Sequence, residues 1–213
     1  MFLLLLALLQ DEPKAAYEAF EKKLTDAKSL RLKWKVDVAI VAGGEKDAIE
    51  LEGELSMRSD DRARFFAKGK YLGTDFAGAS VCDGKTLRVK MADVPADDRK
   101  CPDNLTKGLS QLSARAGLYA VVASGKPKLG LDEEWALSDF RKVDGEKAIR
   151  FTVESGVKKE QFIAKVWLDA KTGLAVKRVV RGGDDKIEIT ITETWSEAVL
   201  DAEMPDEEFE FEK

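Results

Sequence analysis

The clearest pattern in the chain is an alternation of apolar and polar residues that begins at Leu30. Apolar side chains occupy every second position from Leu30 to Ile40, and mostly charged residues fill the positions between them. A period of two is typical of a β-strand with one buried and one solvated face. A second alternating run at 49–57 follows the turn at 42–47, so the two runs predict a hairpin in which Ile40 pairs with Ile49.

Similar runs recur along the chain, with turns rich in Gly and Asp between them, and predict about ten strands in meander order. We expect the later strands at 62–68, 71–82, 85–91, 136–143, 146–154, 161–168, 174–181 and 186–195. The pairs Asp83-Gly84 and Asp144-Gly145 are typical of tight hairpins. The acidic tail at 204–211 contains two alternating Phe residues and predicts a last strand at a sheet edge.

Two segments have the spacing of helices instead. Tyr17, Phe20 and Leu24 follow Pro13 on one apolar face and predict an amphipathic helix over 13–28. The segment 92–135 interrupts the strands, and helical spacing is found for Leu105, Leu109, Leu112, Ala116 and Tyr119. A wide sheet with one apolar face needs cover, so we expect an α+β fold in which the sheet curves around these helices. The concave side then either binds an apolar ligand or is filled by side chains.

Composition and charge remove several classes of function. The 213 residues are 44% hydrophobic and 35% charged, which fits one globular domain and is too apolar for a disordered chain. A net charge of −5 disfavours binding to the phosphates of nucleic acid. The chain has no His, which excludes His-activated Ser or Cys nucleophiles and His-built zinc sites. We expect no cofactor, no metal site and no enzymatic activity.

The N-terminus and the cysteines bear on the compartment. Residues 1–10 form an apolar block of signal-peptide size, although they lack a positively charged start, and the alternative is that they cover an edge of the core. We expect export, with a single domain over 11–213. In an exported chain, Cys82 and Cys101 are expected to form a disulfide, and the alternative is two unrelated thiols.

Two motifs of possible catalytic meaning have plainer explanations. The stretch 79–86 matches a relaxed form of the P-loop sequence motif. A phosphate-binding P-loop leads into a helix N-terminus, whereas this stretch is predicted to continue as a strand. Acidic residues cluster at 132–134 and at 207–208, and a hydrolase that uses acids alone would need two of them inside the cavity. Solvated surface is the favoured interpretation of these clusters.

The alternation also predicts which apolar side chains point inward and line the concave face. No carboxylate belongs to this set. The predicted ligand-binding residues are Trp34, Val36, Val38, Leu51, Leu55, Phe76, Val89, Met91, Leu109, Leu112, Phe151, Val166 and Ile189.

Three stretches of the chain resemble LolA-type periplasmic lipoprotein carriers. They are the hairpin at 81–87, the strand–turn–strand unit at 166–174, and the C-terminal segment at 204–211. The resemblance covers most of 13–211 and implies an open, unclosed antiparallel β half-barrel of about ten or eleven strands, with helices over its concave face.

The resemblance also implies a function. The protein would be a monomeric, non-enzymatic carrier that shields the acyl chains of a lipoprotein, or another lipid, during transport to the outer membrane. Its partners would then include an inner-membrane donor and an outer-membrane acceptor. The alternative is an envelope stress sensor or protein-interaction module built on the same fold.

Overall fold

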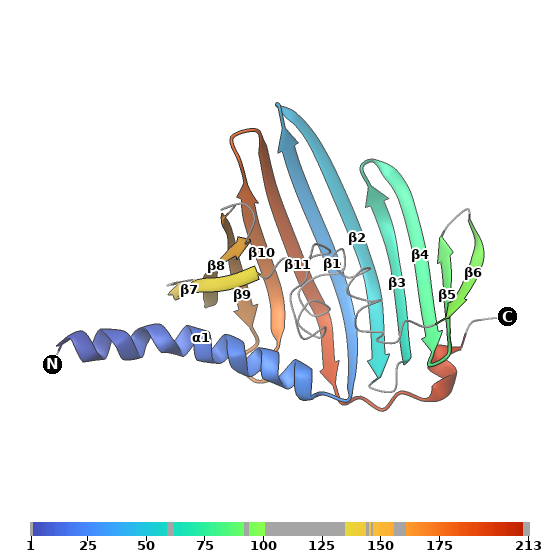
Figure 1. Cartoon of the computed structure of the whole chain (residues 1–213), viewed down its shortest axis with the longest axis horizontal. Helices are drawn as coiled ribbons and strands as arrows, with labels where there is room; N and C mark the ends of the chain where they lie inside the picture. Colours follow the sequence, from blue (N-terminus) through green and yellow to red (C-terminus); the bar gives the residue numbers. More distant parts are fainter. Residues whose placement is uncertain are drawn as a thin grey trace.

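An antiparallel sheet of eleven strands forms the centre of the molecule, which is described from a computed structural model (Figure 1). The structure describes residues 2–58, 62–91, 94–100, 135–143, 145, 147–155 and 161–210. The strands are β1 Ser29–Ala42, β2 Glu45–Arg58, β3 Arg62–Tyr71, β4 Thr74–Asp83, β5 Thr86–Met91, β6 Val94–Lys100, β7 Trp135–Val143, β8 Ala148–Ser155, β9 Gln161–Leu168, β10 Ala175–Gly183 and β11 Ile187–Leu200.

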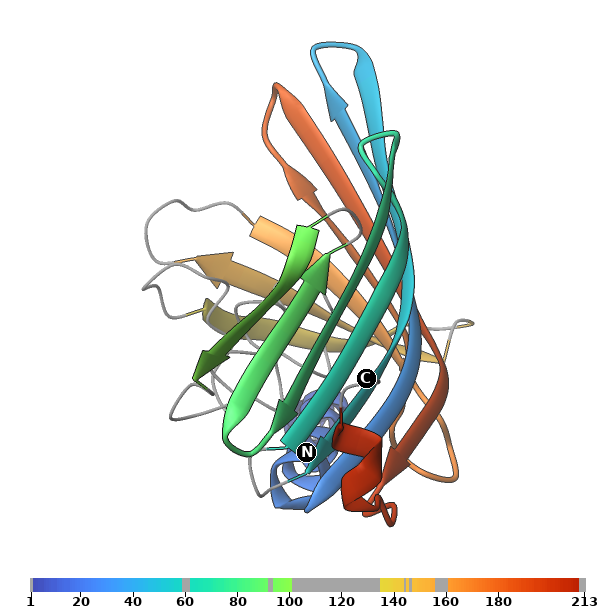
Figure 2. The ribbon, with the colours of Figure 1, turned by 90° about the vertical axis from the view of Figure 1, so that its right-hand side faces the viewer.

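The first and last strands pair with each other in the middle of the sheet. The strand order is β6-β5-β4-β3-β2-β1-β11-β10-β9-β8-β7, so two meanders are joined along the β1–β11 ladder. Meander order is confirmed within each block of strands, whereas the pairing of the first strand with the last was not predicted. The two halves curve toward the same side (Figure 2). Among the described residues, the edge strands β6 and β7 do not pair with each other, so the sheet is an open half-barrel.

The hairpin of β1 and β2 has a different register from the one predicted. Val38, rather than Ile40, lies opposite Ile49, and Ala42 lies opposite Glu45. Gly43 and Gly44 both have positive φ, at 59° and 89°, which is the backbone of a two-residue turn that matches the twist of the strands. The shift amounts to two residues. Because side chains alternate with a period of two, it leaves every inward side chain on the inner face.

Helix α1 spans Phe2–Asp26 and includes Pro13, whereas the sequence predicted a helix over 13–28. In the view of Figure 1 it runs below β9, β10 and β11 toward the start of β1. Tyr17, Phe20 and Leu24 are buried and belong to the main hydrophobic core. The predicted apolar face is therefore confirmed, and α1 closes the lower end of the inner side of the sheet.

The second predicted helical segment is described only in part. Strand β6 lies within 92–135, so the predicted interruption of the sheet does not begin at residue 92. Pro95 is tolerated in β6 because this strand is at the edge of the sheet and needs a partner on one side only. The helix expected around 105–119 lies outside the described residues, so α1 is the one described helix of the expected cover.

The tail is a short 3-10 helix, η1 (Asp206–Phe209), and the predicted edge strand is wrong. Phe209 is 1% exposed and packs with Val81 and Met204 in a second, smaller core. Val81 lies opposite Arg64 and alternates with the inward-facing Cys82, so this core is on the outer, convex side of the sheet. A buried Phe on that side explains why the tail folds back and does not extend the sheet.

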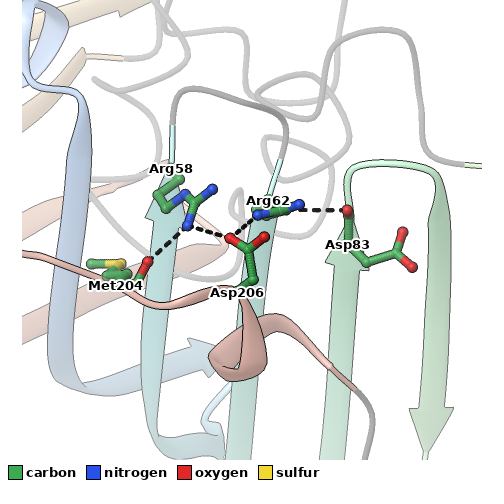
Figure 3. A network of polar contacts seen from close by, with 5 residues as sticks. All are labelled: Arg58, Arg62, Asp83, Met204 and Asp206. Carbon is green, nitrogen blue, oxygen red and sulfur yellow. Dashed lines mark hydrogen bonds and ion pairs between the residues drawn. The ribbon is translucent and has the colours of Figure 1, made fainter.

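Charged contacts fix η1 to the ends of β2 and β3 (Figure 3). The Arg58 guanidinium donates to the Met204 carbonyl at 2.7 Å and to the Asp206 carboxylate at 2.8 Å. Arg62 contacts the same carboxylate and also donates to the Asp83 carbonyl at 3.3 Å. Asp206 therefore joins β2 and β3 to the tail, so η1 is part of the domain.

Candidate functional site

The inner face of the sheet is the candidate site, and α1 covers its lower part. The Tyr17 ring lies 4.9 Å from the Phe151 ring and 5.7 Å from the Phe140 ring, measured between centroids. Burial is the main cause that raises the pKa of Tyr17 above its ordinary value, and the nearby Glu21 carboxylate raises it further. The phenol therefore stays neutral, and this end of the inner face is a closed apolar core.

Burial decreases along the strands from this core toward the hairpin tips. On β1, Leu32, Trp34 and Val36 are buried, while Val38 and Ile40 are only partly buried. The pairing extends this gradient to the neighbouring strands, because residues directly opposite each other point to the same side. We call the partly covered zone the upper inner face; its residues are Val38, Ile40, Ile49, Tyr71, Val180, Ile189 and Ile191.

The upper inner face is continuous across five strands. Val38 lies opposite Ile49 on one side and Ile191 on the other, Ile191 lies opposite Val180, and Ile49 lies opposite Tyr71, which is 38% exposed. A continuous zone of branched apolar side chains that neighbouring elements only partly cover is the usual composition of a binding surface.

The structure distributes the predicted ligand-binding residues over this gradient. Trp34, Val36, Leu51, Leu55, Phe151 and Val166 are buried in the main core. The partly buried ones are Val38, Phe76, Val89 and Ile189, and Met91 is 44% exposed. Leu109 and Leu112 lie outside the described residues. The described members share the inner face, but only some of them remain accessible.

One buried ion pair on the inner face was missed from the sequence. The Arg178 guanidinium donates twice to the Glu193 carboxylate, at 2.5 and 2.8 Å, and the two side chains are 17% and 3% exposed. Glu193 lies opposite Val36 and Arg178, and the next row toward the hairpin tips contains Val38 and Ile191. The pair therefore lies between the closed core and the upper inner face.

The predicted inward set, which contains no carboxylate, is therefore incomplete. A signal was present in the sequence, because Glu193 continues the alternation of Ile189 and Ile191 and so falls on an inward position. The geometry does not suit acid catalysis by two carboxylates, since the partner of Glu193 is a guanidinium at hydrogen-bond distance.

A second unusual polar group in the core is the Trp34 indole. Its Nε1–H is buried and has no hydrogen-bond partner within the part of the chain that the structure describes. The ring stacks on Phe65, with centroids 5.7 Å apart, and lies over Gly53, where an added Cβ would come within 2.6 Å of it. A larger residue at 53 would displace the indole, so glycine is required there by packing.

Several expected features concern residues that the structure describes only in part. Cys82 is disulfide-bonded, whereas Cys101 lies outside the described residues, so their pairing stays a prediction. The described residues contain no group of three or more Cys, Asp or Glu side chains placed to hold a metal ion. Within the same residues, no helix has both the length and the hydropathy to span a bilayer.

Comparison with known proteins gives matches in structure but not in sequence. No protein-family model matches the chain, and no curated protein matches it. A LolA superfamily protein from Nitrosomonas europaea is similar in structure with a TM-score of 0.38 and 11% identity, over 93% of this chain and 97% of that one. LprF from Mycobacterium bovis is similar with a TM-score of 0.44 and 12% identity, over 92% and 95% of the two chains.

A third similar structure is a domain described as an outer membrane lipoprotein-sorting protein from Vibrio parahaemolyticus. Its TM-score is 0.36 and its identity 8%, over 92% of this chain and 94% of that one. The resemblance to LolA-type proteins stated from the sequence is thus found again among solved structures. Since every one of these TM-scores is below 0.5 and every identity is 12% or lower, the matches carry no argument for a function, which rests on the residues of the inner face.

Proposed function

We propose that the upper inner face binds the acyl chains of a lipid or lipoprotein, and that the protein is a non-enzymatic carrier. The observation that supports the proposal is the continuous, partly exposed apolar zone from Val180 through Ile191 and Val38 to Tyr71. Each buried methylene contributes about 0.8 kcal/mol, so burial alone can hold an acyl chain without any covalent step. The Arg178–Glu193 pair closes the lower end of this zone.

The proposal includes the cellular compartment in which the protein acts. A carrier of this kind would act in the periplasm between an inner-membrane donor and an outer-membrane acceptor. The apolar segment at 1–10 supports export, because its length and composition suit a signal peptide. The ligand would leave and enter over the hairpin tips, where burial is lowest.

The first test is native mass spectrometry, combined with organic extraction, of protein purified without detergent from its own envelope fraction. Bound diacyl species or acylated protein are the expected result. A clean apo mass, together with no binding of a fluorescent fatty acid, would refute the proposal and favour the protein-interaction module.

A pair of variants then localises the site. Ile189 and Thr190 are neighbours on β11 that point to opposite faces of the sheet, and both are partly buried. Ile189→Asn should weaken binding of the fluorescent fatty acid about five-fold, because about 1 kcal/mol of apolar contact with the ligand is lost. Thr190→Asn is the matched control and should bind as the unmodified protein does. Equal effects of both variants would place the ligand elsewhere.

A further inference from the structure

The outer face of β8, β9 and β10 carries a cluster of basic residues. Arg150 lies opposite Lys165, and both point away from the inner face because they alternate with Phe151 and Val166 of the main core. On β10, Lys177 and Arg181 point the same way as these two residues.

Apolar residues lie between these cations. Ile163 is 39% exposed and is separated from Trp167 by one outward position, that of Lys165. The Lys177 ammonium lies over the Trp167 ring, 5.0 Å from its centroid. We call this group the basic outer patch; its residues are Arg150, Ile163, Lys165, Trp167, Lys177 and Arg181.

The other half of the outer face has a different charge pattern. There the basic residues of β1 and β3 face acidic neighbours: Lys33 is 3.0 Å from Glu197, and Lys68 is 3.2 Å from Glu52. In the patch, Asp139 is the nearby carboxylate on β7, and it is shared by Arg141 at 2.7 Å and Arg150 at 4.0 Å. Arg150, Lys165, Lys177 and Arg181 thus gather on one side of the sheet in a chain of net charge −5.

We propose that the basic outer patch docks the protein on a membrane surface that contains anionic phospholipid. Lys and Arg near such a surface are attracted by the negative potential of its phosphates. Trp is favoured at the boundary between headgroups and acyl chains, and a branched aliphatic side chain adds apolar contact. An acidic protein would satisfy the cations as well, but it would not need an exposed Ile163 next to an indole.

The position of the patch is compatible with ligand binding, although the two do not depend on each other. Strands β9 and β10 present the patch on one face and Val180 of the upper inner face on the other. A protein that rests on a membrane through the patch thus keeps its inner face away from the lipid headgroups and open to a ligand. Membrane docking and acyl-chain binding can be measured separately, so a negative result for one proposal does not refute the other.

The test is flotation of the full chain with vesicles of phosphatidylcholine alone and of phosphatidylcholine mixed with phosphatidylglycerol. Binding is expected only with the anionic lipid and should fall as salt is added, because salt screens the attraction. The double variant Lys177→Glu and Arg181→Glu should bind at least about 25-fold more weakly, since each cation contributes about five-fold to partitioning.

The matched control is Lys68→Glu with Lys70→Glu, which makes the same change in net charge on the outer face of β3. It should keep most of the binding. A second readout is Trp fluorescence, since vesicles should shift the emission of the unmodified protein but not that of Trp167→Phe. Both proteins carry Trp135→Phe, so that the fourth Trp of the chain does not contribute. Trp34 and Trp195 are buried and should contribute little to the shift.

Three outcomes would overturn the proposal. One is the absence of binding to the anionic vesicles, and another is an equal loss of binding in both double variants. The third is binding of an acidic polypeptide with no binding of vesicles, which would assign the patch to an acidic protein partner.

Discussion

Replacement of Arg178 by Met should destabilise the protein strongly, because it leaves the buried carboxylate of Glu193 without its guanidinium. Glu193 is 3% exposed and receives two hydrogen bonds from Arg178. Loss of one partner of a buried ion pair costs about 3–5 kcal/mol. We expect about 3 kcal/mol for Arg178→Met, at the low end, because Arg178 is 17% exposed and Met retains the apolar contacts of its stem.

The double variant tests whether this cost comes from an unpaired charge. Arg178→Met combined with Glu193→Leu removes both charges and keeps apolar volume, so its stability should lie close to that of the unmodified protein. The two single changes are then strongly non-additive, with a coupling energy of at least about 3 kcal/mol, because Glu193→Leu alone also leaves a partner unpaired. Urea unfolding followed by circular dichroism gives all four free energies of unfolding.

A surface pair supplies the control for this cycle. Lys68 and Glu52 lie 3.2 Å apart, but their side chains are 57% and 56% exposed. The same cycle there, with Lys68→Met and Glu52→Leu, should give a coupling of about 0–1 kcal/mol because water screens exposed pairs. If the cycles at Arg178 and at Lys68 gave similar couplings, the assignment of a desolvated charge pair to the inner face would be refuted.

Two further predictions concern the tail and a turn. Phe209→Ala should cost about 3 kcal/mol in urea unfolding, since the ring is 1% exposed in the outer core; a loss below about 1 kcal/mol would contradict the packing of η1. The Asp169 carboxylate accepts backbone N–H groups from Thr172 at 2.8 Å and Lys171 at 3.0 Å, and the Thr172 bond is the main cause that lowers its pKa. A lowered folded-state pKa gives stability that is present above the ordinary Asp value and lost as pH falls through the folded-state value. Asp169→Ala should therefore melt at a lower temperature at neutral pH, and the difference should shrink in acid; a difference independent of pH would exclude this cause.

Local pattern was enough to predict most strands and the face on which their side chains lie. The alternation from Leu30 to Ile40 predicts a strand with one buried face. The spacing of Tyr17, Phe20 and Leu24 predicts a helix with one apolar face. A register error of two residues at Gly43-Gly44 did not disturb this, because the side-chain period is also two. The inward set was thus a property of the sequence alone.

Which inward residues stay accessible was decided by tertiary structure. Trp34 and Ile189 satisfy the same alternation, yet one is 4% exposed and the other only partly buried. The difference depends on contacts between distant segments, because the Trp34 ring of β1 stacks on Phe65 of β3. The tail shows the same limit: its alternating Phe residues fit a strand, and only a buried position for Phe209 beside Val81 selects the 3-10 helix.

The strand order and the charge pair also depended on long-range contacts. Pairing of β1 with β11 joins the two ends of the domain, and no local signal specifies it. That pairing completes the inner face and sets Val36 opposite Glu193, while the β10–β11 ladder sets Glu193 opposite Arg178. The sequence by itself determined the strands, their faces and the apolar character of the inner side. Tertiary structure decided which part of that side is closed core and which part can meet a ligand, because burial depends on what packs against a residue and not on its own neighbours in the chain.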